Sequence, residues 1–169
     1  DRLAGVTDAD GGTYTYGYDG HGNLATVTDA LGNTTTYTYD AGGRVSTVKN
    51  ALGGTASYVY DETGNVAKYT DCAGNVTTYV YDDMDRLTEK NVSGEKTSYT
   101  YSKAGLLTKV TDGMGTVRFS YDSYRRLTGK TDAAGNKLTY TYDKCGRLSS
   151  IDNGFGGTKY EYDIMDRVT

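Results

Sequence analysis

The sequence contains no proline and no tryptophan, only two cysteines and one histidine, and no long apolar run. One histidine and two cysteines cannot supply the ligands of a tetrahedral zinc site. No stretch approaches the roughly 18 apolar residues of a membrane-spanning helix, and no signal peptide is visible, so we expect no membrane span. The 18 basic and 22 acidic residues are scattered and give a net charge of −4, which argues against a nucleic-acid surface and against an electrostatic membrane anchor.

The sequence instead contains a repeat that is rich in tyrosine and glycine, with 18 Tyr and 23 Gly among 169 residues. A Tyr-Asp pair recurs with a period of about 20.6 residues, and a second aromatic residue stands two positions before each pair. The tyrosines of the seven pairs are Tyr18, Tyr39, Tyr60, Tyr81, Tyr121, Tyr142 and Tyr162, and Tyr101, followed by Ser102, fills the one missing position. The aromatic residues before them are Tyr16, Tyr37, Tyr58, Tyr79, Tyr99, Phe119, Tyr140 and Tyr160. The chain is therefore an array of about eight units.

Each unit carries two turn patterns of the form Asp-x-x-Gly, about half a period apart. An Asp at the first position can accept a hydrogen bond from the backbone two residues on, and a Gly at the fourth supplies the positive φ of a type I turn with a bulge. The first pattern follows the tyrosine pair, with the acidic residues Asp19, Asp40, Asp61, Asp82, Asp122, Asp143 and Asp163 and the glycines Gly22, Gly43, Gly64, Gly105 and Gly146. We therefore expect two hairpin connections in each unit.

The segments between the turns are rich in Thr, Tyr and Val, which favour β-strands. Alternation places Tyr37 and Tyr39 on one face and Thr36 and Thr38 on the other, and no segment has helical periodicity. We predict an all-β fold in which residues 1–169 form one continuous antiparallel spiral sheet of about 16 short strands. Equivalent tyrosines of successive units should stack in ladders. A single layer of this kind must curl on itself or pack against another surface.

Some units depart from the pattern. Asp85 and Asp166 replace the turn glycine, which Asp tolerates, whereas Arg125 at the same position costs about 1 kcal/mol if the turn keeps its type. Ser102 offers a weaker hydroxyl in place of the capping carboxylate. The second turns of two units, which begin at Asp112 and Asp152, are altered in length. We therefore expect less regular stacking of equivalent side chains near Phe119 and Tyr160.

The acidic residues allow two interpretations. Asp82, Asp83 and Asp85 could form a carboxylate group for acid–base chemistry, but similar residues recur in every unit, which favours turn capping. Asp8-Ala-Asp10-Gly11 faintly resembles a calcium loop, but the nine-residue glycine-rich period of calcium-binding β-repeats is absent. We therefore predict no catalytic residue, no metal site and no cofactor.

The cysteines and the histidine lie in turns. Cys72 falls in the second turn type and Cys145 in the first, at opposite ends of the strands and about 20 Å apart along them, which is too far for a disulfide. We expect two free thiols. His21 stands between two glycines and should be exposed and chemically inert.

An arginine follows the first turn in many units, at Arg44, Arg86, Arg126, Arg147 and Arg167. These residues could form a basic stripe that binds a polyanion or a glycan. They could equally pair with the turn Asp and pack their stems on tyrosine rings, and we favour this local role. The tyrosine rows could likewise serve as sugar-stacking platforms.

The unit Tyr140-Thr-Tyr142-Asp143-Lys-Cys-Gly146-Arg147-Leu148 resembles the YD repeat of Rhs-type proteins. The resemblance covers essentially the whole chain and is repeated eight times. Asp1-Arg2-Leu3 and Asp166-Arg167-Val168 stand at the same phase of the repeat, so the chain resembles an uncapped fragment of a longer array.

The resemblance implies a structural role. Rhs-type proteins wind such units into a hollow β-shell, often around a C-terminal toxin domain, and related arrays occur in insecticidal toxin complexes, in wall-associated contact-dependent toxins and in teneurins. The implied location is extracellular or at the cell surface. The family's self-cleaving region with its Asp-Pro element is absent, because the chain has no proline.

Three functions therefore remain open at this stage. The array could be part of a non-catalytic wall that encloses or displays a C-terminal toxin polypeptide. It could be a cell-surface module that binds a glycan or a protein. It could also self-assemble into a filament through the unpaired edges of its first and last strands.

Overall fold

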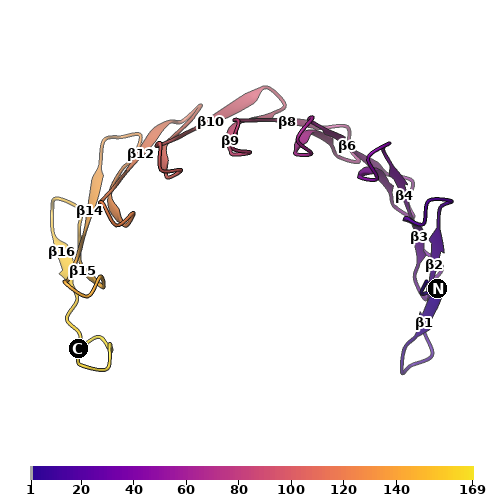
Figure 1. Cartoon of the computed structure of the whole chain (residues 1–169), viewed down its shortest axis with the longest axis horizontal. Coiled ribbons are helices and arrows are strands. Elements are labelled where there is room, and N and C mark those ends of the chain that lie inside the picture. Colours follow the sequence, from indigo (N-terminus) through magenta and orange to yellow (C-terminus); the bar gives the residue numbers. More distant parts are fainter. Residues whose placement is uncertain (1) are drawn as a thin grey trace. The chain divides into compact units, whose positions relative to one another are not determined.

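The computed structural model describes residues 2–169, which form 16 strands in one sheet and, within this range, no helix. The strands are joined in the order of the chain, each beside its sequence neighbours, as the labels in Figure 1 show. Each strand pair with a defined register is antiparallel. The prediction of an all-β antiparallel array of about 16 strands is therefore confirmed. No helix among residues 2–169 has the length and apolar character to cross a membrane.

The contacts divide the chain into two compact units. The first ends at Arg86 and includes Asn91–Gly94, and the second comprises Leu87–Lys90 and Glu95–Thr169. The first contains β1 (Gly5–Thr7), β2 (Thr13–Tyr18), β3 (Leu24–Thr28), β4 (Thr34–Tyr39), β5 (Val45–Lys49), β6 (Thr55–Tyr60), β7 (Val66–Thr70) and β8 (Val76–Tyr81). The second contains β10 (Glu95–Tyr101), β11 (Leu107–Asp112), β12 (Gly115–Tyr121), β13 (Leu127–Thr131), β14 (Lys137–Tyr142), β15 (Leu148–Asp152) and β16 (Gly157–Lys159). Strand β9 (Leu87–Val92) is shared between them.

The turn that follows β4 illustrates the predicted Asp-x-x-Gly turn, which we call a corner. The Gly43 N–H donates to the Asp40 carbonyl at 3.0 Å, and the Asp40 N–H donates to the Arg44 carbonyl at 2.8 Å. Gly43 has a φ of 76°, so this is a type I turn followed by a bulge residue in the left-handed region. The three residues that replace the turn glycine also have positive φ, with 57° at Asp85, 66° at Arg125 and 61° at Asp166. The turn chemistry predicted from the sequence is confirmed at these corners.

One connection was missed by the sequence analysis. The chain turns back after β9 through Ser93, with a φ of 51°, and Gly94, with a φ of 99°. Two successive residues with positive φ make a tight two-residue hairpin turn. The Asp-x-x-Gly pattern does not detect it, because Asn91 here bonds the Gly94 N–H instead, at 2.9 Å.

The two altered second turns differ in their effect on the strand pairing near Phe119 and near Tyr160. β11 and β12 pair regularly up to the two-residue turn, and Phe119 lies opposite Lys130 on β13. The expected irregularity near Phe119 was therefore wrong, because the shortened turn preserves the register. By contrast, β16 ends before Tyr160, whose N–H donates to the Ser149 carbonyl at 2.9 Å outside the regular ladder.

Tyrosines of successive repeats do not form unbroken ladders. An intervening strand separates them, and it places Val27 opposite Tyr16 and Val48 opposite Tyr37. The predicted direct stacking is therefore wrong in detail, because the period of the repeat is two strands and not one. A direct ring contact occurs where the intervening residue is itself a tyrosine, with the Tyr58 and Tyr69 centroids 5.1 Å apart.

A bulge recurs where an even-numbered strand pairs with the next odd-numbered one. On β4 and β5, Thr38 lies opposite Thr47 and Tyr39 opposite Val45, which leaves Ser46 as the additional residue. The Thr38 hydroxyl lies 2.6 Å from Thr47 Oγ1 and 2.8 Å from Ser46 Oγ. Such bulges bend a strand and increase its twist. They therefore bend the sheet at the strand pairs in which they occur.

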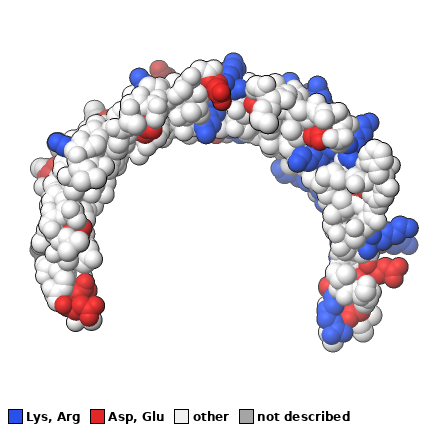
Figure 2. Space-filling model, turned by 180° about the vertical axis from the view of Figure 1, so that it is seen from behind, with Lys and Arg blue, Asp and Glu red and all other residues white. Residues whose placement is uncertain are grey.

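Neither unit contains a conventional hydrophobic core. Ala56, with 8% of its surface exposed, is the one buried apolar residue among those described, and the repeat tyrosines are half-buried. Basic and acidic side chains are interspersed among uncharged ones on the face shown in Figure 2. The sheet is thus stabilised by half-buried side chains and by the hydrogen bonds of its corners.

Candidate functional site

The tyrosine of every Tyr-Asp pair, and Tyr101 of the equivalent Tyr101-Ser102 pair, links its repeat to the preceding one. Its hydroxyl donates a hydrogen bond of 2.7 to 3.1 Å to a backbone carbonyl 14 or 15 residues earlier. The donors are Tyr18, Tyr39, Tyr60, Tyr81, Tyr101, Tyr121, Tyr142 and Tyr162, and the acceptors are Leu3, Leu24, Val45, Val66, Leu87, Leu107, Leu127 and Leu148. Each acceptor other than Leu3 directly follows a first turn. The hydroxyl therefore satisfies a carbonyl close to the bulge, where the ladder is interrupted.

The capping aspartate uses both of its carboxylate oxygens within its own corner. In the corner that begins at Asp143, Oδ1 accepts the N–H groups of Cys145 and Arg147, both at 2.9 Å, and Oδ2 accepts the Nε–H of Arg147 at 2.7 Å. The same three bonds occur at Asp82, with distances of 3.0, 3.1 and 2.8 Å. Of the three carboxylates in the candidate acid–base group, Asp82 therefore caps the turn, while Asp85 occupies its positive-φ position.

The arginine that completes the corner also covers the tyrosine of the next repeat. The guanidinium carbon of Arg44 lies 4.5 Å from the centre of the Tyr60 ring, and that of Arg126 lies 4.4 Å from the Tyr142 ring. Arg147 lies 4.5 Å from the Tyr162 ring. Because each guanidinium is paired with a carboxylate and stacked on a ring, the local role is observed in place of a free basic stripe.

Electrostatics keep the corner aspartates ionised. The hydrogen bond from the Arg86 side chain lowers the pKa of Asp82 to about 2. The backbone N–H of Arg44, followed by its guanidinium, lowers the pKa of Asp40, and the Asn23 side chain lowers that of Asp19. Burial raises the pKa of Tyr81. These shifts all favour the form already present at neutral pH, so they create no acid or base poised for proton transfer.

Two corners replace the arginine by asparagine. Asn23 donates from Nδ2 to Asp19 Oδ2 at 3.0 Å, which retains the cap. Asn65 instead donates to Asp85 Oδ1 of the following corner, at 2.7 Å. Asparagine is too short to cover the next tyrosine as arginine does. Such corners keep the turn but lack the arginine–tyrosine contact with the next repeat.

The remaining residues of the predicted motif lie where the alternation placed them. The aromatic residues two positions before the pairs are half-buried, and seven of them lie on even-numbered strands, namely Tyr16, Tyr37, Tyr58, Tyr79, Tyr99, Phe119 and Tyr140. Tyr160 follows β16. The turn glycines Gly22, Gly43, Gly64, Gly105 and Gly146 have φ values from 76° to 98°. Arg167 pairs with Asp163 at 2.7 Å but remains 77% exposed.

The other residues considered from the sequence also lie in corners. Asp8 Oδ1 accepts the N–H groups of Asp10 and Gly12 at 3.0 and 2.7 Å, as a turn cap does. Cys72 and Cys145 are exposed free thiols. Within residues 2–169, no group of three or more His, Cys, Asp or Glu side chains is arranged to hold a metal ion.

The sequence analysis did not predict the acceptors of the tyrosine hydroxyls. The pattern that could have revealed them is the recurring spacing of 14 or 15 residues between each tyrosine and the Leu or Val that follows the preceding corner. The analysis also left aside Phe155, a 97% exposed side chain at the tip of the loop that joins β15 and β16.

Comparison with known proteins places this geometry in a family. The sequence profile described as Teneurin YD-shell matches residues 31–167, and the RHS repeat profile matches residues 1–34. No curated protein matches the sequence significantly.

Several solved structures are similar to the chain. One is the TcdB2-TccC3-Cdc42 crystal structure, with a TM-score of 0.75 and 20% identity, covering 93% of this chain and 10% of that one. Another is the Photorhabdus luminescens Tc holotoxin pore, with a TM-score of 0.73 and 18% identity, again over 93% and 10%. The chain thus spans about a tenth of the length of these proteins, and the likeness is one of fold. Because the YD-shell profile covers most of the sequence, the chain belongs to the teneurin YD-shell family, as a stretch of structural β-shell repeats.

Proposed function

We propose that this chain is part of the wall of a hollow β-shell that encloses a C-terminal toxin or effector polypeptide, outside the cell or at its surface. The chain itself carries no catalytic residue in this proposal. Its task is mechanical, because it supplies a continuous hydrogen-bonded sheet that separates an enclosed polypeptide from the surroundings.

The observation that carries the proposal is the half-exposed tyrosine face of a single layer. In both units the repeat tyrosines retain solvent exposure, and Ala56 is the one buried apolar residue among those described. A sheet with an apolar face normally buries it against a second layer. An enclosed polypeptide, together with further turns of the same shell, would provide that layer. The short share of the relatives' length that the chain covers supports the existence of such further turns.

Protease protection of the parent protein tests this proposal. We expect its C-terminal segment to resist trypsin while the shell is intact, and to become cleavable when Tyr121→Ala and Tyr142→Ala together remove two cross-repeat links. Met114→Ala is the control, because Met114 is 90% exposed at the turn between β11 and β12. If the C-terminal segment of the wild-type protein is cleaved as fast as that of the doubly substituted protein, the shell does not enclose it.

Self-assembly through edge strands is a second candidate. β1 and β16 each have one strand neighbour, and all of their residues are exposed. Unpaired strand edges can template association. Light scattering distinguishes this function, since a filament-forming chain gives large particles that shrink when Thr7→Pro, at a position whose N–H faces the free side of β1, blocks the β1 edge, whereas a wall segment without this activity gives none.

A further inference from the structure

A hollow in the first unit lies between the corner that follows β2 and the corner that follows β4. It has a volume of about 680 Å³, and its lining includes Asp19, Asn23, Tyr39 and the turn at 40–43. The β3–β4 register, in which Thr26 lies opposite Thr36, brings Asn23 opposite Tyr39 three positions further along. Opposite residues of an antiparallel pair project from the same face of the sheet. The asparagine side chain and the tyrosine ring therefore border the hollow together.

In three other repeats an arginine side chain lies in the equivalent place. The guanidinium carbons of Arg44, Arg126 and Arg147 lie 4.5, 4.4 and 4.5 Å from the centre of the next tyrosine ring. Their Nε–H groups donate to the aspartate of their own corner at 2.8, 2.7 and 2.7 Å. Arg44 also donates to the backbone carbonyl of Asp61 in the next corner, at 3.4 Å. The molecule thus shows which chemical group this place between two corners accommodates.

Beside the hollow the same place is open, because asparagine stands at the arginine position. A Cβ added to Gly43, the turn glycine of the next corner, meets no atom within 4 Å. A Cβ added to the equivalent Gly64 lies 3.6 Å from Arg44 Nη1. Asn23 instead bonds within its own corner, where its Nδ2 donates to Asp19 Oδ2 at 3.0 Å. No guanidinium within residues 2–169 lies over the tyrosine face beside the hollow.

The charge beside the hollow suits a cation. In the part of the chain that the structure describes, no Lys, Arg or His side chain forms an ion pair with Asp19. The other acid of the lining, Asp40, is already paired with Arg44 at 2.8 Å. No lysine or arginine is among the described residues that line the hollow. A carboxylate without a cationic partner, next to an open aromatic face, favours a planar cation.

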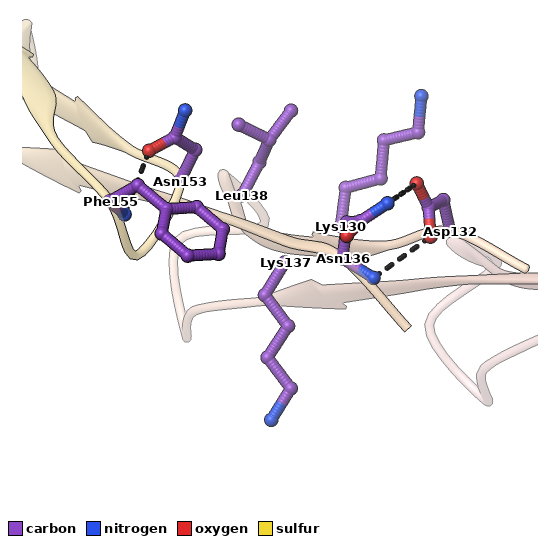
Figure 3. A pocket seen from close by; sticks show the side chains of 7 residues that line it. All are labelled: Lys130, Asp132, Asn136, Lys137, Leu138, Asn153 and Phe155. Atoms are coloured by element: carbon purple, nitrogen blue, oxygen red, sulfur yellow. Dashed lines mark hydrogen bonds between the residues drawn. The ribbon is translucent and has the colours of Figure 1, made fainter. Parts of the chain in front are cut away.

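The hollow in Figure 3, which lies in the second unit, differs in charge. It also has an Asp–Asn pair and an aromatic ring, since Asn136 Nδ2 donates to Asp132 at 2.8 Å and Phe155 lies in the lining. Lys130 and Lys137 line it as well, and they project from opposite faces of the sheet. Two ammonium groups beside one hollow disfavour the entry of a further cation.

The second corner with an asparagine at the arginine position is closed in another way. Asn65 Nδ2 donates to Asp85 Oδ1 of the next corner at 2.7 Å, so the asparagine itself bridges the two corners. This bridge crosses the place that is open beside Tyr39. The hollow beside Tyr39 therefore combines an open place, an aromatic face and a carboxylate without a cationic partner.

We propose that the hollow beside Tyr39 binds the arginine side chain of another polypeptide. The guanidinium stacks on the Tyr39 ring, as it does in the covered repeats, and its N–H groups bond the Asp19 carboxylate. The backbone carbonyl of Asp40 accepts a further N–H, as that of Asp61 does from Arg44. Arginine fits this place better than lysine, because a planar guanidinium can stack on a ring and donate from its edge at the same time.

An NMR titration of the chain tests the proposal. The probe is a short peptide with blocked termini and one arginine flanked by glycines, and the assigned ring signals of Tyr39 and Tyr60 are followed. We expect saturable shifts at Tyr39 with a weak, millimolar affinity, and none at Tyr60, which Arg44 already covers. Matched peptides with lysine or with citrulline, the neutral analogue of arginine, should bind at least about fivefold more weakly.

Asn23→Arg supplies the guanidinium from the chain itself and should remove the peptide-induced shift at Tyr39. Asn33→Arg is the matched control, because it adds the same charge to a second turn in which Asn33 Nδ2 likewise donates to its aspartate, at 2.8 Å. It should leave the shift unchanged. Because Asn23→Arg recreates the arrangement of the covered repeats, the thermal unfolding midpoint should not fall. Loss of binding by this variant therefore reports on the hollow and not on unfolding.

The proposal is overturned if the arginine peptide produces no shift at Tyr39, if the lysine or citrulline peptide binds as tightly, or if Asn23→Arg binds as the wild type does. Shifts with N-methylguanidinium but none with the arginine peptide would also overturn it, because the hollow would then bind a free small cation and not the side chain of a polypeptide.

Discussion

The Tyr142 hydroxyl donates a 2.7 Å hydrogen bond to the carbonyl of Leu127, 15 residues earlier, and the Tyr142 ring lies under the guanidinium of Arg126. Arg126 in turn is bonded to Asp122 at the start of its own corner. One tyrosine therefore contacts both the backbone and the side chains of the preceding repeat. In a sheet with so little burial, links of this kind couple one repeat to the next.

Tyr142→Phe isolates the hydroxyl. The ring and its contact with Arg126 remain, while the Leu127 carbonyl loses its partner, so we expect the free energy of unfolding to fall by about 1 kcal/mol. Urea unfolding followed by circular dichroism measures it. Tyr124→Phe is the control, because Tyr124 is 78% exposed and should change stability by less than about 0.5 kcal/mol. Equal effects of the two substitutions would show that the hydroxyl bond contributes nothing.

Gly32→Ala tests the corner conformation. Gly32 has a φ of 84°, and a Cβ added there meets no atom within 4 Å, so the cost is conformational and should be about 1 kcal/mol. Gly20 also has free space but lacks a positive φ, and Gly20→Ala should leave stability unchanged or raise it slightly. A thermal unfolding midpoint lowered equally by both substitutions would contradict the assigned turn type.

The lowered pKa values of the corner aspartates predict that the stability of the fold depends on pH in the acid range. The folded-state pKa of Asp82 is about 2, below its ordinary value of 3.8, and those of Asp40 and Asp143 are also lowered. A lowered pKa means that the stabilising contribution is complete above the ordinary value and is lost as the pH falls through the folded-state value.

The urea midpoint should therefore decrease between about pH 4 and pH 2 and stay level above about pH 5. Asp82→Asn should lower the midpoint at neutral pH and reduce the decrease in acid. A midpoint that is flat down to about pH 2 would exclude ionised corner caps as a source of stability.

Much of this fold could be predicted because its corners are local. Asp40 and Gly43 are three positions apart along the chain, and their turn needs no distant partner. Alternation then assigned Tyr37 and Tyr39 to one face. The two-residue turn at Ser93 was missed, because a serine with positive φ leaves no pattern in the sequence.

The links between repeats could not be predicted, because they depend on register. The bulge residue Ser46 shifts the pairing of β5 by one residue. Period-2 alternation therefore does not predict that the Val45 carbonyl accepts the Tyr60 hydroxyl, because this contact depends on the register of the folded sheet. The unbroken tyrosine ladders failed for a different reason, because an intervening strand places Val27 opposite Tyr16 and Val48 opposite Tyr37. The role of the Arg126 guanidinium was one of two open interpretations, and the 4.4 Å distance to Tyr142 decided between them.

A double-mutant cycle on Arg126→Ala and Tyr142→Leu tests coupling between neighbouring repeats most directly. We expect the two losses of unfolding free energy to be non-additive by about 0.5 to 1 kcal/mol. The matched cycle on Asn23→Ala and Tyr39→Leu, where an asparagine stands at the arginine position, should be additive. Losses that add to within about 0.3 kcal/mol in the Arg126–Tyr142 cycle would show that the arginine–tyrosine contact does not couple the repeats.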